Sequence, residues 1–123
     1  MIGLGIDLCE VSRMEYTLQR NEGFLNRFFT AEERAYLDGR GKMVAQSVAA
    51  MFAAKEAFLK ALGVGLSGGI AMADVGVLHD ALGCPHYALS GQAQQMLAAK
   101  GAQTAHLSLT HDAGIAAAVC VLE

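Results

Sequence analysis

Apolar and polar residues alternate near the start of the chain, which is the pattern of a β-strand with one apolar face. Ile2, Leu4 and Ile6 alternate there with two glycines and with Asp7. The face formed by the glycines and Asp7 has no bulky side chain, so another group can approach that backbone closely. The same alternation returns in residues 106–110. Further strands are predicted by short β-prone segments over residues 74–79, 86–90 and 115–122.

A long helix is predicted in the middle of the chain. Residues 42–62 contain neither glycine nor proline and are rich in good helix formers. Apolar side chains cover much of the girth of this helix, so we expect it to be central in the fold. Gly63 follows directly and is expected to close the helix.

Shorter helices are predicted from their N-terminal signals. The capping-box spacing occurs at Ser12–Glu15, where the helix should run to residues 21–23, and at Thr30–Glu33, where it should stop at Gly39. Ser90 is expected to cap another helix over residues 92–100. The order strand, three helices, two strands, helix and hairpin predicts one α+β domain over residues 1–123, with a small antiparallel sheet packed on the long central helix.

Composition adds an expectation about assembly. A chain of 123 residues buries about two-thirds of its unfolded surface, enough for a core without disulfides. Hydrophobic residues make up 54% of the chain and charged residues only 17%, against about 25% in a typical domain. The low charge indicates that part of the surface is hidden, most simply between subunits.

Charge and cysteine content exclude several classes of protein. The net charge of −3 argues against a general nucleic-acid binder, although eight of the nine Lys and Arg residues lie in the first 62 positions and allow a local basic site. The three cysteines form no CxxC pair, which favours a reducing compartment and a cytoplasmic protein. No signal peptide and no membrane-spanning segment is predicted.

Glu56 is the most informative residue for chemistry. Its neighbours on the predicted helix, at positions 49, 52, 53 and 59, are all apolar, and a carboxylate there is costly unless it is paired. An ordinary ion pair with Lys60, one turn later, is one explanation. The alternative joins Glu56 to Asp7 as two carboxylates that hold Mg²⁺ on a phosphate, with Lys60 neutralising charge. Spacing alone does not show that Asp7 and Glu56 meet.

Two other segments allow more than one interpretation. The glycines in Gly63–Gly65 and Ser67–Gly69 are compatible with a phosphate cradle, but this loop follows a helix, so a simple C-cap and turn is equally favoured. His106, Ser108 and Thr110 share one strand face, with His111 at the following turn. Contacts to a ligand and a solvated sheet face are equally compatible with this pattern.

Three arginines recur every seven residues in the first part of the chain. If Arg13, Arg20 and Arg27 lie on one helix, they form a basic stripe, although Gly23 is able to bend it. Such stripes are usually solvated faces. A functional stripe would suit an acidic partner.

The chain resembles the 4′-phosphopantetheinyl transferases, in particular their short bacterial type, over nearly its whole length. Residues 2–13, IGLGIDLCEVSR, are similar to the opening G-x-D…R motif of that family. Residues 52–60, FAAKEAFLK, resemble its K-E-A-x-x-K signature, and residues 106–111 with the apolar tail resemble its last hairpin. Asp7, Glu56 and Lys60 are the positions that match. Met51, Cys84 and Ile115 depart from the family pattern, and this affects the nucleotide contacts expected there.

The resemblance implies a function and an assembly. A member transfers 4′-phosphopantetheine from coenzyme A to a serine of apo acyl carrier protein in fatty acid biosynthesis, with Mg²⁺ as cofactor, and adenosine 3′,5′-bisphosphate leaves. It also implies the half-size transferase fold and a homotrimer with active sites between subunits. The His106–Thr110 strand of one chain would then face the Lys60 loop of the next. No nucleic acid and no membrane is expected as a partner.

The resemblance also assigns roles to individual residues. Asp7 and Glu56 would hold the metal, and Glu56 and Lys60 would be catalytic, with either Glu56 or a water on the metal taking the serine proton. The acidic carrier protein would bind the stripe of Arg13, Arg20 and Arg27. Coenzyme A would contact a larger set, namely Lys42, Lys60, Gly63, Gly65, His106 and Thr110.

Two other functions remain compatible with the residues. One is a non-catalytic coenzyme A- or nucleotide-binding oligomeric module, which a missing carboxylate would favour. The other is a plain interaction domain in which Glu56 and Lys60 form only a structural pair.

Overall fold

A computed structural model describes residues 1–65 and 68–123. Its regular elements follow one another as β1 (Gly3–Glu10), α1 (Val11–Arg20), α2 (Phe24–Phe28), α3 (Ala31–Asp38), η1 (Gly41–Met43), α4 (Val44–Leu62), η3 (Met72–Asp74), β2 (Val75–His79), β3 (Pro85–Leu89), α5 (Gly91–Ala99), β4 (Ala105–Asp112) and β5 (Ile115–Leu122). The expected α+β architecture is confirmed.

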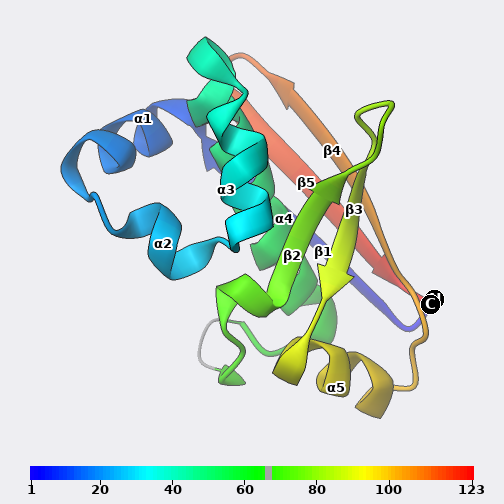
Figure 1. The fold of residues 1–123 in the computed structure, drawn as a ribbon. Helices are drawn as coiled ribbons and strands as arrows, with labels where there is room; N and C mark the ends of the chain where they lie inside the picture. Colours follow the sequence, from blue (N-terminus) through cyan, green and yellow to red (C-terminus); the bar gives the residue numbers. More distant parts are fainter. Residues whose placement is uncertain (66–67) are drawn as a thin grey trace.

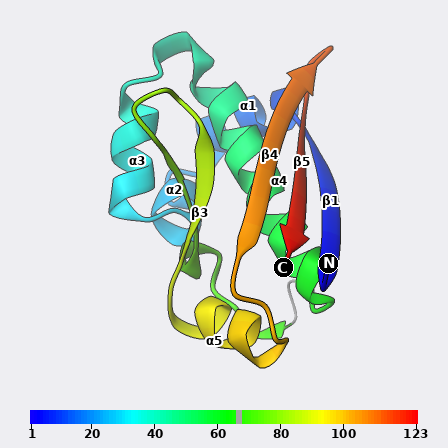
Figure 2. The same ribbon diagram turned by 90° about the vertical axis from the view of Figure 1, so that its right-hand side faces the viewer.

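The strands form two antiparallel sheets. One contains three strands in the order β1-β5-β4, and the other is the β2-β3 hairpin. Figure 2 shows the three-stranded sheet on one side of α4 and helices α2 and α3 on the other. The hairpin crosses in front of α4 in Figure 1, and α5 closes the end of the molecule where the two termini lie.

Helix α4 is the centre of the core, as its sequence predicts. Fourteen of its residues are buried, among them Val48, Ala53 and Phe58, which are fully enclosed. The helix packs most extensively against β1 and β5. Gly63 ends it in the left-handed conformation, with φ of +82°, and its N–H donates to the Lys60 carbonyl over 3.0 Å.

The glycines of β1 allow that strand to lie directly on α4. A Cβ atom built on Gly3 would lie 2.3 Å from the Ala61 carbonyl oxygen, and one on Gly5 would lie 1.9 Å from that of Ala57. The sequence predicted that a group would approach this backbone closely. The group is the central helix rather than a ligand.

A buried ion pair joins α3, α4 and the hairpin. The Lys55 ammonium lies 2.9 Å from the Glu33 carboxylate, and both side chains are fully enclosed. Lys55 Nζ also donates to the carbonyls of Met72 and Val75, while Glu33 Oε2 accepts from the N–H of Val77. Each charge therefore has several partners, which a buried ion needs.

Two of the predicted helix starts differ in detail. Helix α1 begins at Val11 after Glu10 and makes no side-chain cap, so the Ser12–Glu15 capping box does not form, and the helix ends at Arg20. The Thr30–Glu33 capping box is confirmed, since the Thr30 N–H donates to Glu33 Oε1 and the Glu33 N–H donates to Thr30 Oγ1. Ser90 precedes α5 without capping it, because its hydroxyl pairs instead with Asp74.

Alternation in β1 places apolar side chains on the face of the three-stranded sheet away from α4. Leu4, Ile6 and Leu8 of β1 are 57%, 63% and 62% exposed. Their partners on β5 in the strand register are Val121, Val119 and Ala117. Within the described residues, no helix combines the length and the hydropathy that crossing a membrane requires.

Candidate functional site

Asp7 and Lys60 meet where β1 crosses the last turns of α4. Lys60 Nζ donates to Asp7 Oδ1 over 2.8 Å and to the Ile6 carbonyl over 3.1 Å. The Asp7 side chain is 11% exposed, whereas that of Lys60 is 54% exposed. The alternative in which Lys60 pairs with Glu56 is therefore wrong in this structure, because Asp7 takes the ammonium.

Glu56 lies beside the Asp7 carboxylate. Burial raises the pKa of the Glu56 carboxyl above its ordinary value, and the charge and hydrogen bond of Asp7 raise it further. Arg13 and Lys60 act in the opposite direction on this pKa. The structure thus places Asp7 and Glu56 side by side, which their spacing in the sequence could not show. Their pairing concentrates negative charge that Arg13 and Lys60 both offset.

This pair suits a magnesium ion. Mg²⁺ is usually held by one or two carboxylates, with water and substrate phosphates completing its ligands. Among residues 1–65 and 68–123, no group of three or more His, Cys, Asp and Glu side chains is arranged to hold a metal. A metal at Asp7 and Glu56 would therefore depend on other oxygen ligands, as a phosphate substrate supplies.

The loop after α4 borders this site. Glu56, Leu59, Lys60 and Gly65 line a shallow cavity of about 210 Å³, and Gly65 has a φ of +63°. Gly63 serves as the C-cap of α4. Ser67, which belongs to the second glycine-rich part of the proposed cradle, lies outside the described residues.

The polar residues of β4 divide between its two faces. His106 and Thr110 are exposed on the outer face, where their register partners on β5 are Val121 and Ala117, and His106 Nε2 lies 3.0 Å from Glu123 Oε1. Within the described chain, neither residue lines a cavity with Lys60. His111 belongs to β4 rather than to the turn.

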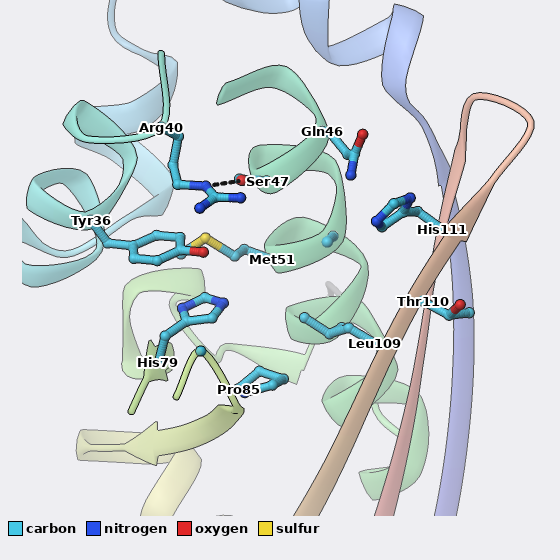
Figure 3. A pocket seen from close by; sticks show the side chains of 12 residues that line it. Tyr36, Arg40, Gln46, Ser47, Met51, His79, Pro85, Leu109, Thr110 and His111 are labelled. Carbon is cyan, nitrogen blue, oxygen red and sulfur yellow. Dashed lines mark hydrogen bonds between the residues drawn. The ribbon is translucent and has the colours of Figure 1, made fainter. Parts of the chain in front are cut away.

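A second cavity lies at the other half of α4. It has a volume of about 240 Å³ and is formed between the end of α3, the first half of α4, the hairpin and β4 (Figure 3). Arg40, His79 and His111 are its basic lining residues, and Met51 and Pro85 are among its apolar ones. Sequence reasoning singled out neither Arg40 nor His79, because their elements meet only in the folded chain.

The predicted arginine stripe does not lie on one helix. Arg13 and Arg20 belong to α1, while Arg27 belongs to the separate helix α2. The Arg20 guanidinium lies 4.0 Å from the centroid of the Tyr16 ring, and Tyr16 is 60% exposed. Arg13 lies close enough to Glu56 to lower the pKa of its carboxyl. The stripe is therefore broken, and its first member reaches the carboxylate pair.

Lys42, the remaining candidate, is exposed in the short η1 segment that leads into α4. Sequence reasoning missed the Glu33–Lys55 pair. The only signal available for it was a lysine on the apolar face of the predicted helix, four residues after Met51. No pattern in the sequence identified its partner, because Glu33 already fitted its capping box.

Comparison with known proteins gives consistent results. A sequence model of the 4′-phosphopantetheinyl transferase superfamily matches residues 3–120. The chain is 48% identical over 124 residues to holo-[acyl-carrier-protein] synthase of Trichlorobacter lovleyi, covering 100% of this chain and 98% of the relative. It is also 48% identical to the protein of the same name from Treponema denticola, with the same coverage.

Solved structures resemble the fold over its full length. Holo-[acyl-carrier-protein] synthase from Neisseria meningitidis matches with a TM-score of 0.87 and 32% identity, covering 100% of this chain and 98% of that one. The enzyme of the same name from Helicobacter pylori, solved in complex with coenzyme A, matches with a TM-score of 0.84 and 30% identity, covering 98% and 99%.

Proposed function

Because the chain belongs to the 4′-phosphopantetheinyl transferase superfamily, we propose that Asp7, Glu56 and Lys60 form the catalytic centre of a holo-[acyl-carrier-protein] synthase. The chain is an enzyme that transfers 4′-phosphopantetheine from coenzyme A to a serine of apo acyl carrier protein. The observation that carries the proposal for the site is the meeting of three charged side chains from β1 and α4 on an otherwise apolar core.

Asp7 and Glu56 are the residues that would hold Mg²⁺. When bound, the ion would supply positive charge to the diphosphate of coenzyme A. Lys60, which is half exposed and bonded to Asp7, is positioned to donate to the leaving α-phosphate as negative charge develops there. All three groups come from regular elements, so their separations are held by the fold.

The reaction is a displacement at phosphorus. The serine oxygen forms a bond to the β-phosphorus, and the bond from that phosphorus to the bridging oxygen breaks, releasing adenosine 3′,5′-bisphosphate. The serine proton goes to Glu56 or to a water molecule. Mg²⁺ held by Glu56 would favour the ionised carboxylate, which is the form able to accept the serine proton.

Coenzyme A is expected to reach the centre along the loop that follows α4. Gly63 and Gly65 leave space beside Lys60, and Gly65 borders the cavity shared with Glu56. His106 and Thr110 project from the outer face of the sheet, away from the Lys60 of their own chain. We therefore propose that these two residues, with Lys42, contact a coenzyme A held by a neighbouring chain.

The exposed apolar face of the sheet supports a homotrimer with active sites between subunits. Leu4, Ile6 and Leu8 form a continuous apolar row beside the β5 side chains, and such patches mark association surfaces. Ile6 and Leu8 also border Asp7 and Lys60 in a cavity of about 400 Å³. An interface on this row would bring a second chain to the catalytic centre.

An acidic carrier protein is expected to dock along α1, where Arg13 and Arg20 lie on one exposed side, and to reach Arg27 on α2. We place the enzyme in the cytoplasm and in fatty acid biosynthesis, since Cys9, Cys84 and Cys120 are free thiols, as a reducing compartment favours. The alternative of a non-catalytic coenzyme A-binding module lacks support, because both carboxylates and Lys60 are in place.

The test is direct transfer. The protein is incubated with coenzyme A, Mg²⁺ and apo acyl carrier protein, and the carrier is examined by mass spectrometry. We expect a gain of roughly 340 Da on one serine, the covalent mass of phosphopantetheine. Omitting Mg²⁺ with a chelator present should prevent the gain, and a carrier with alanine at that serine should gain nothing. An unmodified carrier under the complete conditions would refute the function.

A further inference from the structure

The buried ion pair of Glu33 and Lys55 lies next to the proposed catalytic centre along α4. Lys55 directly precedes Glu56 in the helix. The acceptors of the Lys55 ammonium all belong to other elements: the Glu33 carboxylate on α3 and the carbonyls of Met72 and Val75. The turn of α4 that carries the proposed catalytic carboxylate is therefore also the turn that holds these three groups.

Stability alone does not explain a lysine at this position. Both side chains of the pair are fully enclosed, and apolar side chains in place of a buried ion pair often leave a protein equally stable or more stable. An apolar side chain, however, cannot donate to main-chain carbonyls. The Lys55 nitrogen lies 3.0 Å from the Met72 carbonyl oxygen and 2.9 Å from that of Val75. What the lysine adds is a fixed position of this segment relative to α4.

The segment that this lysine holds extends back to the cavity at the catalytic centre. We call residues 68–75 the return segment, because they lead from the loop after α4 to β2. At the start of this segment the Gly68 N–H donates to the Gly65 carbonyl over 3.4 Å, and Gly65 lines a cavity with Glu56. Ile70, in the middle of the segment, is buried. A shift of the return segment would therefore move the wall of that cavity.

Resting on the proposed function, we propose that Glu33 and Lys55 are positioning residues, which hold the return segment so that Gly65 borders the path of coenzyme A to the catalytic centre. Glu33 takes part because it ties the lysine to α3 and β2: its Oε1 accepts from Lys55, and its Oε2 accepts from the Val77 N–H over 3.0 Å. Neither side chain touches the substrate, since both are fully enclosed. Loss of either should weaken the binding of coenzyme A and leave the binding of the carrier protein, which is expected at α1, unchanged.

Steady-state kinetics with each substrate varied separately test this proposal, with every variant assayed below its own melting transition. Lys55→Met should raise the KM for coenzyme A about tenfold and leave the KM for the carrier unchanged. Leu37→Ala is the matched control for a loss of stability alone, because Leu37 is buried on the same helix as Glu33 but has no polar group to hold the return segment. If Lys55→Met does not fold, Glu33→Gln takes its place. Its amide keeps an acceptor for Lys55 but lacks the charge, so the KM for coenzyme A should rise about threefold.

Measurements without transfer separate this proposal from the proposed function. Coenzyme A is titrated calorimetrically into the unmodified chain and the variants, and hydrogen exchange is followed at the amides of Gly68 and Asp74, which both donate within the loop and return segment. Weaker binding of coenzyme A and faster exchange in Lys55→Met than in Leu37→Ala would support the positioning role even if no carrier is ever modified. An unchanged affinity for coenzyme A in Lys55→Met, an equal loss of affinity in Leu37→Ala, or equal exchange in the two variants would overturn it.

Discussion

Two lysines on α4, five positions apart, have opposite roles. Lys55 is fully enclosed and bonded to Glu33, and burial lowers the pKa of its ammonium despite the raising effect of that carboxylate. Lys60 is half exposed, and its bond to Asp7 raises its pKa. One lysine therefore joins elements of the core, whereas the other holds its charge beside Asp7 at the surface.

Replacing each lysine by methionine should separate these roles. Lys55→Met leaves the Glu33 carboxylate buried without its cation, and we expect the free energy of unfolding to fall by about 3–5 kcal/mol. Lys60→Met should change that free energy far less, because the pair with Asp7 is open to solvent, but it should remove transfer activity. Denaturant unfolding and a transfer assay on both variants make the comparison. Equal stability of the two variants would contradict the structural role of Lys55.

Glu56→Gln tests the carboxylate pair. The amide keeps the shape of the side chain but lacks the charge that Mg²⁺ needs, so turnover should fall about 100-fold or more while the fold is retained. The measurement is the transfer rate at saturating Mg²⁺, with circular dichroism as the control for folding. Near-normal turnover would exclude Glu56 as a metal ligand.

At the scale of elements, local sequence predicts the helices and strands but not every partner. Helices α3 and α4 were predicted correctly. Their signals, the Thr30–Glu33 capping box and a run without glycine or proline, are local in the sequence. Helix α2 was missed, since its five residues carry no cap or period. The Asp7–Glu56 pair was proposed because a carboxylate on an apolar helix face needs a partner. The sequence could not show that the two residues meet, because the approach of β1 to α4 depends on contacts between residues about fifty positions apart.

The helix α1 should act as a docking element for the carrier protein. Reversing charge in Arg20→Glu is expected to raise the KM for the carrier about tenfold and to leave the KM for coenzyme A unchanged, because rim charges act mainly on encounter. Added salt should weaken the unmodified enzyme in the same way. Arg13→Glu should also lower kcat, because Arg13 lies near Glu56. The measurement is steady-state kinetics with each substrate varied separately. An equal rise in KM for the carrier and for coenzyme A with Arg20→Glu would exclude a docking role for α1.

At the scale of the whole molecule, the outer face of the sheet carries an exposed row of apolar side chains on β1. A single folded chain leaves Leu4, Ile6 and Leu8 in contact with water. The low charged fraction led to the expectation that part of the surface is hidden between subunits, but it did not indicate which element would carry exposed apolar side chains. The apolar row lies on the outer face because Gly3 and Gly5 are the residues of β1 that pack against α4.

If the chain forms the proposed homotrimer through this apolar row, Leu4→Glu should disrupt that assembly. A buried charge in the row of apolar side chains is costly, so light scattering should show a smaller species and transfer activity should fall with it. Leu82→Glu is the matched control, because Leu82 is 95% exposed in the turn of the hairpin and should leave the assembly unchanged. A fully active monomer, in either the variant or the unmodified enzyme, would contradict sites between subunits.

The contact of Gly3 and Gly5 with the carbonyls of α4 has a consequence for how this enzyme tolerates change. The distance from strand to helix is set there by main chain against main chain, with no side chain acting as a spacer. Shortening core side chains elsewhere, as in Phe58→Leu, should lower the melting temperature while the affinity of the proposed Asp7–Glu56 site for Mg²⁺ stays constant. Substitutions in the core can therefore change the melting temperature without changing metal affinity as the sequence evolves. Gly3 and Gly5 are the exceptions, because replacing either by alanine would push β1 away from α4 and alter both properties.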